Sequence, residues 1–260
     1  MSDSEEPSSK QLNTNEDTEL LYELVRDSSL LSHVVLIGAS ALIPIPFLDD
    51  LTKGFLQRRL LTSIAEREGL QLEKQDCQHL QHKESSGCCA LGCLSSAILY
   101  PLKRVLRKLF FFLEIKRAVD QSTTALAQAW LLQLTLRKGM WQPNSHSADT
   151  QALRRAIQKS CRHNGVKPLE LAFRQGFKGA KGTFQSFASK FTRDFKTDER
   201  EIEVAVNDFE NQQKNELENL SQKLSGSLDQ VSSSYLENFV LNFQEQLTKE
   251  LAAPRNPESA

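Results

Sequence analysis

The chain has 260 residues, 39% of them hydrophobic and 25% charged, so it is long enough to bury a core of its own. Eleven glycines, eight prolines and five cysteines exclude a collagen-like chain and a dense disulfide scaffold. The net charge of −1 conceals a segregation: residues 1–29 and 198–260 carry −6 and −8, whereas residues 103–197 carry +14. This pattern predicts an anionic partner for the basic middle, or pairing of the middle with the acidic ends.

The first residues are acidic and polar and do not resemble a secretory signal. We therefore expect residues 1–16 to form a disordered acidic tail and the cysteines to be reduced thiols. No later stretch alternates between apolar and polar residues with a period of two, whereas helical spacing recurs throughout. The sequence predicts an all-α fold: a helical bundle with proline-broken apolar hairpin segments.

Residues 17–140 are expected to form a helical core that contains two charge-free apolar runs, 28–48 and 85–102. A first helix is predicted from about residue 17 to residue 31. Pro44 and Pro46 should end the next helix near residue 43, because proline in a helix interior removes a hydrogen bond and clashes with the preceding turn. Asp49 is the predicted cap of a helix over about 51–68 that ends at Gly69, and residues 71–87 read as a polar connector.

Each charge-free run is close to the ~20 apolar residues that a membrane-spanning helix needs. The second run is followed at once by four bases, which begin a basic amphipathic helix that continues to about residue 139. Bases at this position are attracted to anionic headgroups. We predict that these four residues bind the membrane: Lys103, Arg104, Arg107 and Lys108.

After a linker at 141–150, residues 151–197 form a predicted basic amphipathic segment. Six of the 14 phenylalanines recur there with helical spacing and should share one face of a helix, which we call the Phe stripe. Lysines, including Lys178 and Lys181, occupy the other faces, which is typical of a helix at a membrane interface. The members of the Phe stripe are Phe173, Phe177, Phe184, Phe187, Phe191 and Phe195.

Residues 198–253 carry apolar residues spaced mostly by four, which predicts one long acidic helix, followed by a tail at 254–260. Such a helix could join the bundle or form a short coiled coil that makes the protein a homo-oligomer. It could also fold back on the basic middle and mask it. Removal of residues 198–260 should then strengthen membrane binding.

The run at 41–70 combines an Ile-Pro-Ile-Pro segment, an Asp pair and an amphipathic helix. It resembles uncharacterised bacterial helical domains, among them the hairpin domain that follows Era-like GTPase domains and the EcsC-like proteins. The resemblance implies that residues 43–46 close a membrane-dipping helix and that Asp49 or Asp50 caps the next one. Because the chain has no GTPase motif, the resemblance assigns no activity.

Cysteine and histidine residues cluster between positions 77 and 93 and raise three alternatives: a Zn²⁺ site, S-acylation beside the basic helix, or plain packing of thiols. The spacing lacks the Cys-x₂-Cys pair of common zinc sites, so no cofactor is expected. The candidate ligands are Cys77, His79, His82, Cys88 and Cys93.

Other chemistries fit poorly. Residues 176–183 hold Gly, Lys and Thr, but Gly182 interrupts the P-loop order and no strand precedes it. Nucleic-acid binding would place aromatic residues among the bases, whereas the Phe stripe lies apart from them. No common catalytic motif is present, so the sequence does not favour an enzyme.

The sequence thus predicts a non-enzymatic, membrane-associated adaptor or scaffold on the cytoplasmic face of an anionic membrane. One alternative is a soluble, cytoplasmic all-α bundle that binds proteins, and another is a metal or redox module at 77–93.

Overall fold

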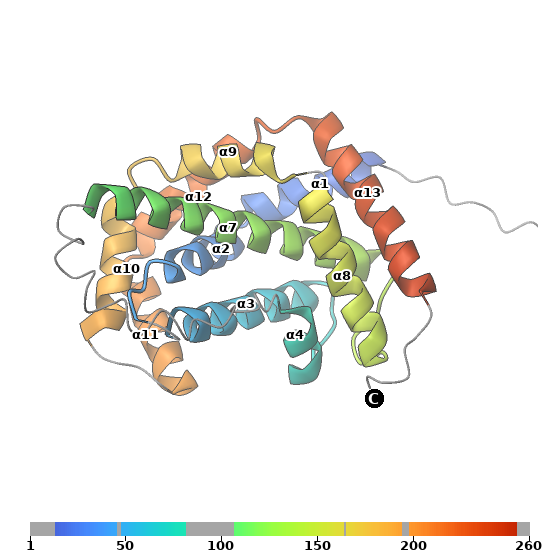
Figure 1. Ribbon diagram of the computed structural model, residues 1–260, viewed down its shortest axis with the longest axis horizontal. Helices are drawn as coiled ribbons and strands as arrows, with labels where there is room; N and C mark the ends of the chain where they lie inside the picture. The colour runs from blue at the N-terminus through green and yellow to red at the C-terminus, as the bar shows by residue number, and fades with distance from the viewer. Residues whose placement is uncertain (1–13, 46–47, 82–106, 164, 194–197, 254–260) are drawn as a thin grey trace, which may run out of the picture.

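A computed structural model describes residues 14–45, 48–81, 107–163, 165–193 and 198–253. These residues form eleven helices and contain no strand, which confirms the all-α prediction. In Figure 1, α2 and α7 run across the middle, with α9 and α12 above them and α3 and α4 below. The helices α10 and α11 lie at one end of this body, and α8 and α13 lie at the other.

Most described residues of the charge-free run at 28–48 are buried in the core. The first predicted helix, 17–31, ends five residues earlier than expected. α1 (Thr14–Arg26) is followed at once by α2 (Ser28–Ser40), because Asp27 caps α2 by accepting hydrogen bonds from the backbone N–H groups of Ser29 and Leu30. Ten residues of α2 are buried. Within the described residues, no helix is both long and apolar enough to cross a membrane.

The α2 helix approaches α7 (Arg107–Arg137) very closely. A Cβ at Gly38 would lie 2.1 Å from Oγ of Ser122 and 2.7 Å from the carbonyl oxygen of Ala118. The Ser122 hydroxyl donates a 3.0 Å hydrogen bond to the carbonyl of Val34. Glycine on one helix and a small hydroxyl on the other therefore let the two backbones pack directly together.

The next helices confirm the predicted ends and correct one connector. α3 (Leu48–Arg67) begins three residues earlier than expected, and Gly69 ends it with a φ of +72°. The predicted connector at 71–87 contains α4 (Lys74–Leu80), with Cys77 and Leu80 buried. α7 ends as expected at Gly139, which has a φ of +64°. The second charge-free run, 85–102, lies outside the described residues.

The carboxy-terminal half has shorter helices than predicted. The linker at 141–150 ends early, because α8 (Ser147–His163) starts within it. The Phe stripe spans two helices, α9 (Lys167–Gly176) and α10 (Lys181–Arg193), separated by a turn in which Gly179 has a φ of +90°. The predicted single helix at 198–253 is wrong: it is three helices, α11 (Glu199–Gln212), α12 (Lys214–Leu228) and α13 (Ser233–Ala252).

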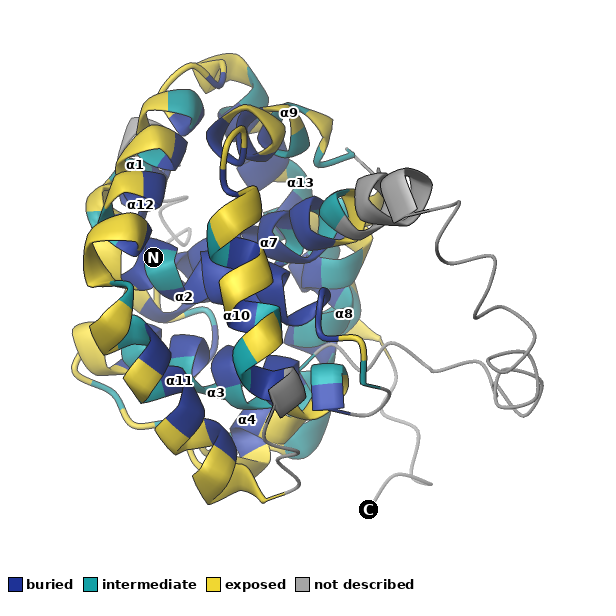
Figure 2. Cartoon of the chain, turned by 90° about the vertical axis from the view of Figure 1, so that its left-hand side faces the viewer, coloured by how far each residue is buried: buried dark blue, intermediate teal, exposed yellow. Residues whose placement is uncertain are grey.

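The three acidic helices belong to the same core as the rest. Trp130 of α7 stacks on Phe239 of α13 with ring centroids 5.6 Å apart. A Cβ at Gly176 would lie 2.9 Å from Cα of Leu224, so α9 and α12 also touch backbone to backbone. Figure 2 shows that buried residues line the inner faces of α11 and α12 while exposed residues line their outer faces.

Candidate functional site

The Phe stripe faces the interior of the protein. Phe173, Phe184, Phe187 and Phe191 have 0% of their surface exposed, and Phe177 has 5%. The rings of Phe187 and Phe209 of α11 meet edge to face at 5.0 Å. The predicted amphipathic spacing is therefore present, but the stripe packs on the chain's own helices. Phe195 lies outside the described residues.

The face of α9 opposite the Phe stripe is basic and exposed. Lys167, Leu171 and Arg174 are exposed on α9, where at about 100° per residue they fall within an arc of roughly 60°, and the exposed Lys178 follows in the turn after α9. Leu171 leaves 58% of its surface exposed in the middle of the three bases. We call these four residues the α9 stripe. The spacing of these residues by four, three and four could have predicted this stripe from the sequence. The prediction of a membrane contact was instead made for the Phe stripe of the same segment.

The electrostatics of this face favour an anion. Lys167 and Lys178 form no ion pair with any described residue. Glu170 is the one acid of α9 and is half-buried. Burial raises the pKa of nearby Asp120, while the charges of Lys116 and Arg174 act to lower it. Lys181, also predicted as an anion-binding residue, is exposed just beyond the stripe.

The structure does not describe the side chains of the four bases that follow the second charge-free run. Lys103 and Arg104 lie outside the described residues. Arg107 and Lys108 begin α7, but their side chains are outside the described part. Their role at a membrane stays a prediction.

Some residues of the acidic segment 198–253 form ion pairs with the basic segment 151–197. Glu250 of α13 accepts hydrogen bonds from Arg155 and Lys159 of α8, both at 2.6 Å, and Lys190 lies 3.4 Å from Asp208. These pairs partly neutralise Arg155 and Lys159 of α8 and Lys190 of α10. They do not include the α9 stripe. Because α11 to α13 also complete the core, deletion of residues 198–260 would remove packing together with charge, so it no longer isolates masking.

The two described members of the Cys/His cluster, Cys77 and His79, contact different residues. Burial raises the pKa of Cys77, whose sulfur lies 3.9 Å from Oγ1 of Thr62. Nδ1 of His79 lies 3.4 Å from Nε2 of Gln151. Among the described residues, no group of three His, Cys, Asp or Glu side chains could hold a metal ion. His82, Cys88 and Cys93 lie outside these residues.

Asp49 is not the residue that caps α3. It lies inside the first turn, where a carboxylate interacts favourably with the helix dipole, and its Oδ2 accepts a 3.2 Å hydrogen bond from Arg117 of α7. Burial and neighbouring Asp50 raise its pKa. Asp49 thus helps to anchor α3 to α7.

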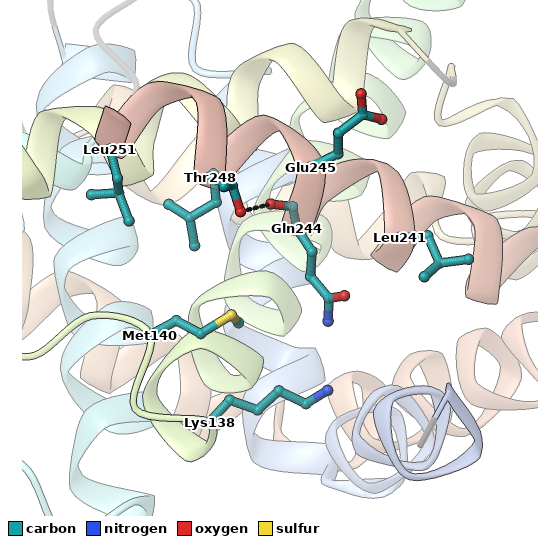
Figure 3. A pocket seen from close by; sticks show the side chains of 8 residues that line it. Lys138, Met140, Leu241, Gln244, Glu245, Thr248 and Leu251 are labelled. Carbon is teal, nitrogen blue, oxygen red and sulfur yellow. Dashed lines mark hydrogen bonds between the residues drawn. The ribbon is translucent and has the colours of Figure 1, made fainter. Parts of the chain in front are cut away.

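Two hollows lie elsewhere on the described surface. A groove of about 550 Å³ runs along α13, where Leu241 and Leu251 leave 42% and 38% of their surfaces exposed. Figure 3 shows Met140 and Lys138 on its far side, opposite Gln244. The second hollow, of about 220 Å³, lies where α4, α7 and α8 meet.

Comparisons with protein families, curated proteins and solved structures returned no match to this chain. The resemblance of residues 41–70 to bacterial membrane-associated helical domains remains a prediction.

Proposed function

We propose that this chain is a non-enzymatic adaptor whose α9 stripe docks on the cytoplasmic face of an anionic membrane. The observation that supports the proposal is the exposure of Leu171 between Lys167, Arg174 and Lys178. A leucine flanked by bases can insert between the lipid headgroups while the bases contact anionic lipids. In this proposal the α9 stripe contacts the bilayer, in place of the Phe stripe that the sequence predicted for this role.

The expected attachment is weak and reversible. Each base near an anionic surface contributes about 1 kcal/mol, and full burial of a leucine contributes about 1.5–3 kcal/mol. Three bases and a partly buried leucine therefore give on the order of 5 kcal/mol, which corresponds to peripheral binding. Because the charge term is screened by salt, binding should fall steeply as ionic strength rises.

The test is sedimentation of the full chain with vesicles of phosphatidylcholine containing phosphatidylserine. Replacement of Lys167, Arg174 and Lys178 by Gln should weaken binding about a hundredfold, because about 3 kcal/mol of attraction is removed. The matched control replaces Arg200, Lys214 and Lys223, three exposed bases of α11 and α12, by Gln. This control changes the net charge equally and should bind like the unmodified chain.

Equal losses in the two triple variants would mean that net charge alone drives adhesion, which contradicts a specific stripe. Absence of the unmodified chain from the vesicle pellet at low salt would reject the membrane function. Equal binding to vesicles of pure phosphatidylcholine would reject the anionic requirement.

The groove along α13 favours a second candidate, a helical bundle that binds another protein. Leu241 and Leu251 are exposed ten residues apart on α13, which places them nearly three helical turns from each other beside Met140. An amphipathic helix laid along α13 could cover both leucines. Replacement of Leu241 by Glu would abolish that contact and leave vesicle binding through α9 unchanged.

A further inference from the structure

The second hollow is lined by both apolar and cationic side chains. Leu80 of α4, Ile157 of α8 and Val166 between α8 and α9 supply apolar surface to a partly enclosed cavity of about 220 Å³. Arg154 and Arg162 of α8 also line it. They lie eight residues apart, about two helical turns, on the same side of the helix.

Neither guanidinium has a partner in the described part of the chain. Arg154 and Arg162 form no hydrogen bond or ion pair there, and Nε of Arg154 is buried without an acceptor. Their neighbours on another face of α8 differ: Arg155 and Lys159 both bind Glu250. The bases of α8 that face α13 are therefore paired with an acid, whereas the two that line the cavity have no acceptor among the described residues.

The described lining supplies no negative charge to these bases, since no residue that lines the cavity is acidic. Cys161 also lines it, but burial raises the pKa of this thiol to about 12, so the sulfur stays neutral near pH 7. Gln128 of α7 already donates a 2.7 Å hydrogen bond to the carbonyl of Leu80. A buried guanidinium N–H without an acceptor is costly, which makes an external anion the missing element.

We propose that this cavity binds a small carboxylic acid with a short hydrocarbon tail. The carboxylate would accept hydrogen bonds from Arg154 and Arg162, since its geometry matches the donor fork of a guanidinium. The tail would cover Leu80, Ile157 and Val166. A volume of 220 Å³ equals the liquid volume of about seven water molecules, which limits the tail to a few methylene groups.

The proposal is tested by isothermal titration of the full chain with hexanoate. Hexanol carries the tail without the charge and acetate carries the charge without the tail. Both should bind at least about tenfold more weakly than hexanoate, because each lacks one of the two contacts. Arg154→Gln and Arg162→Gln should each weaken hexanoate binding about tenfold, the loss of one charge-assisted hydrogen-bonded contact.

Arg200→Gln, an exposed base of α11, is the matched control and should leave hexanoate binding unchanged. A thermal melt monitors the fold of each variant. Equal hexanoate affinity in Arg154→Gln, Arg162→Gln and Arg200→Gln would overturn the proposal, as would the lack of saturable hexanoate binding. Because the α9 stripe is not used, these outcomes leave the vesicle test independent.

Discussion

Truncation of Phe187 to Ala should lower the free energy of unfolding by about 3–5 kcal/mol, the usual range for removing a buried aromatic side chain. Phe187 has none of its surface exposed and contacts the rings of Phe191 at 4.9 Å and Phe209 at 5.0 Å. Its removal leaves a cavity between α10 and α11 that the neighbouring helices cannot fully close. Urea unfolding followed by circular dichroism measures the loss.

The matched control is Gln185→Ala, at an exposed position two residues away on α10, which should change stability by less than about 0.5 kcal/mol. If Phe187→Ala fails to fold, Phe187→Leu gives a smaller loss of the same sign. Stability equal to that of Gln185→Ala, together with loss of vesicle binding, would contradict the buried stripe and return it to the membrane interface.

His33 should make the protein less stable as the pH falls from about 6.5 to 4. Burial and the charge of Arg59 lower the pKa of this histidine to about 4, although Asp27 acts in the opposite direction. Nε2 lies 3.7 Å from Oε1 of Glu210, which is too long for a hydrogen bond. The folded protein therefore holds a neutral imidazole over a pH range in which the unfolded chain binds a proton.

A depressed histidine pKa contributes stability at neutral pH that is lost as the pH falls from the unfolded value toward the folded one. The loss is about 3 kcal/mol when complete. His33→Leu removes this titration, so the unmodified chain should lose about 3 kcal/mol more than the variant between pH 7 and pH 4. Burial raises the pKa of Glu210, which acts in the opposite direction but is present in both proteins. Parallel urea-unfolding curves across this range would contradict a buried neutral His33.

The fold class could be predicted because helical spacing is local information. Gly69 and Gly139 illustrate this: both end helices where expected, and both adopt a positive φ that glycine takes at little cost. The predicted break near residue 43 also lies close to the observed end of α2 at Ser40.

The lengths of the last helices could not be read from the same spacing. Apolar residues at mostly helical spacing continue across Gln213 and Asp229, so periodicity predicts one helix where the structure has three. The serines at 232–234 were a sequence signal for a new helix start, since Ser232 caps the first turn of α13 by accepting a hydrogen bond from the backbone N–H of Tyr235. The breaks let α12 reach α9 and α13 reach α8, and such long-range packing is not encoded in a local pattern.

The candidate site was only half predictable for a related reason. An amphipathic helix shows which residues share a face, but lipid and a protein core accept the same apolar face. The partner of the Phe stripe includes Phe209, a residue of another helix. Only the placement of α11 and α12 showed that the phenylalanines point inward and that Lys167, Leu171, Arg174 and Lys178 face outward.

The docking of α9 on a bilayer is tested most directly by tryptophan fluorescence at the α9 stripe. Leu171→Trp and Val204→Trp form a matched pair, because the native residues are 58% and 59% exposed on α9 and α11. The natural Trp130 and Trp141 are buried and give a common background that the unmodified chain supplies for subtraction. On vesicles containing phosphatidylserine, the emission of Trp at position 171 should shift to shorter wavelength and be quenched by brominated lipid, while that at position 204 should not change. Identical responses at the two positions, or none at position 171, would contradict docking through α9.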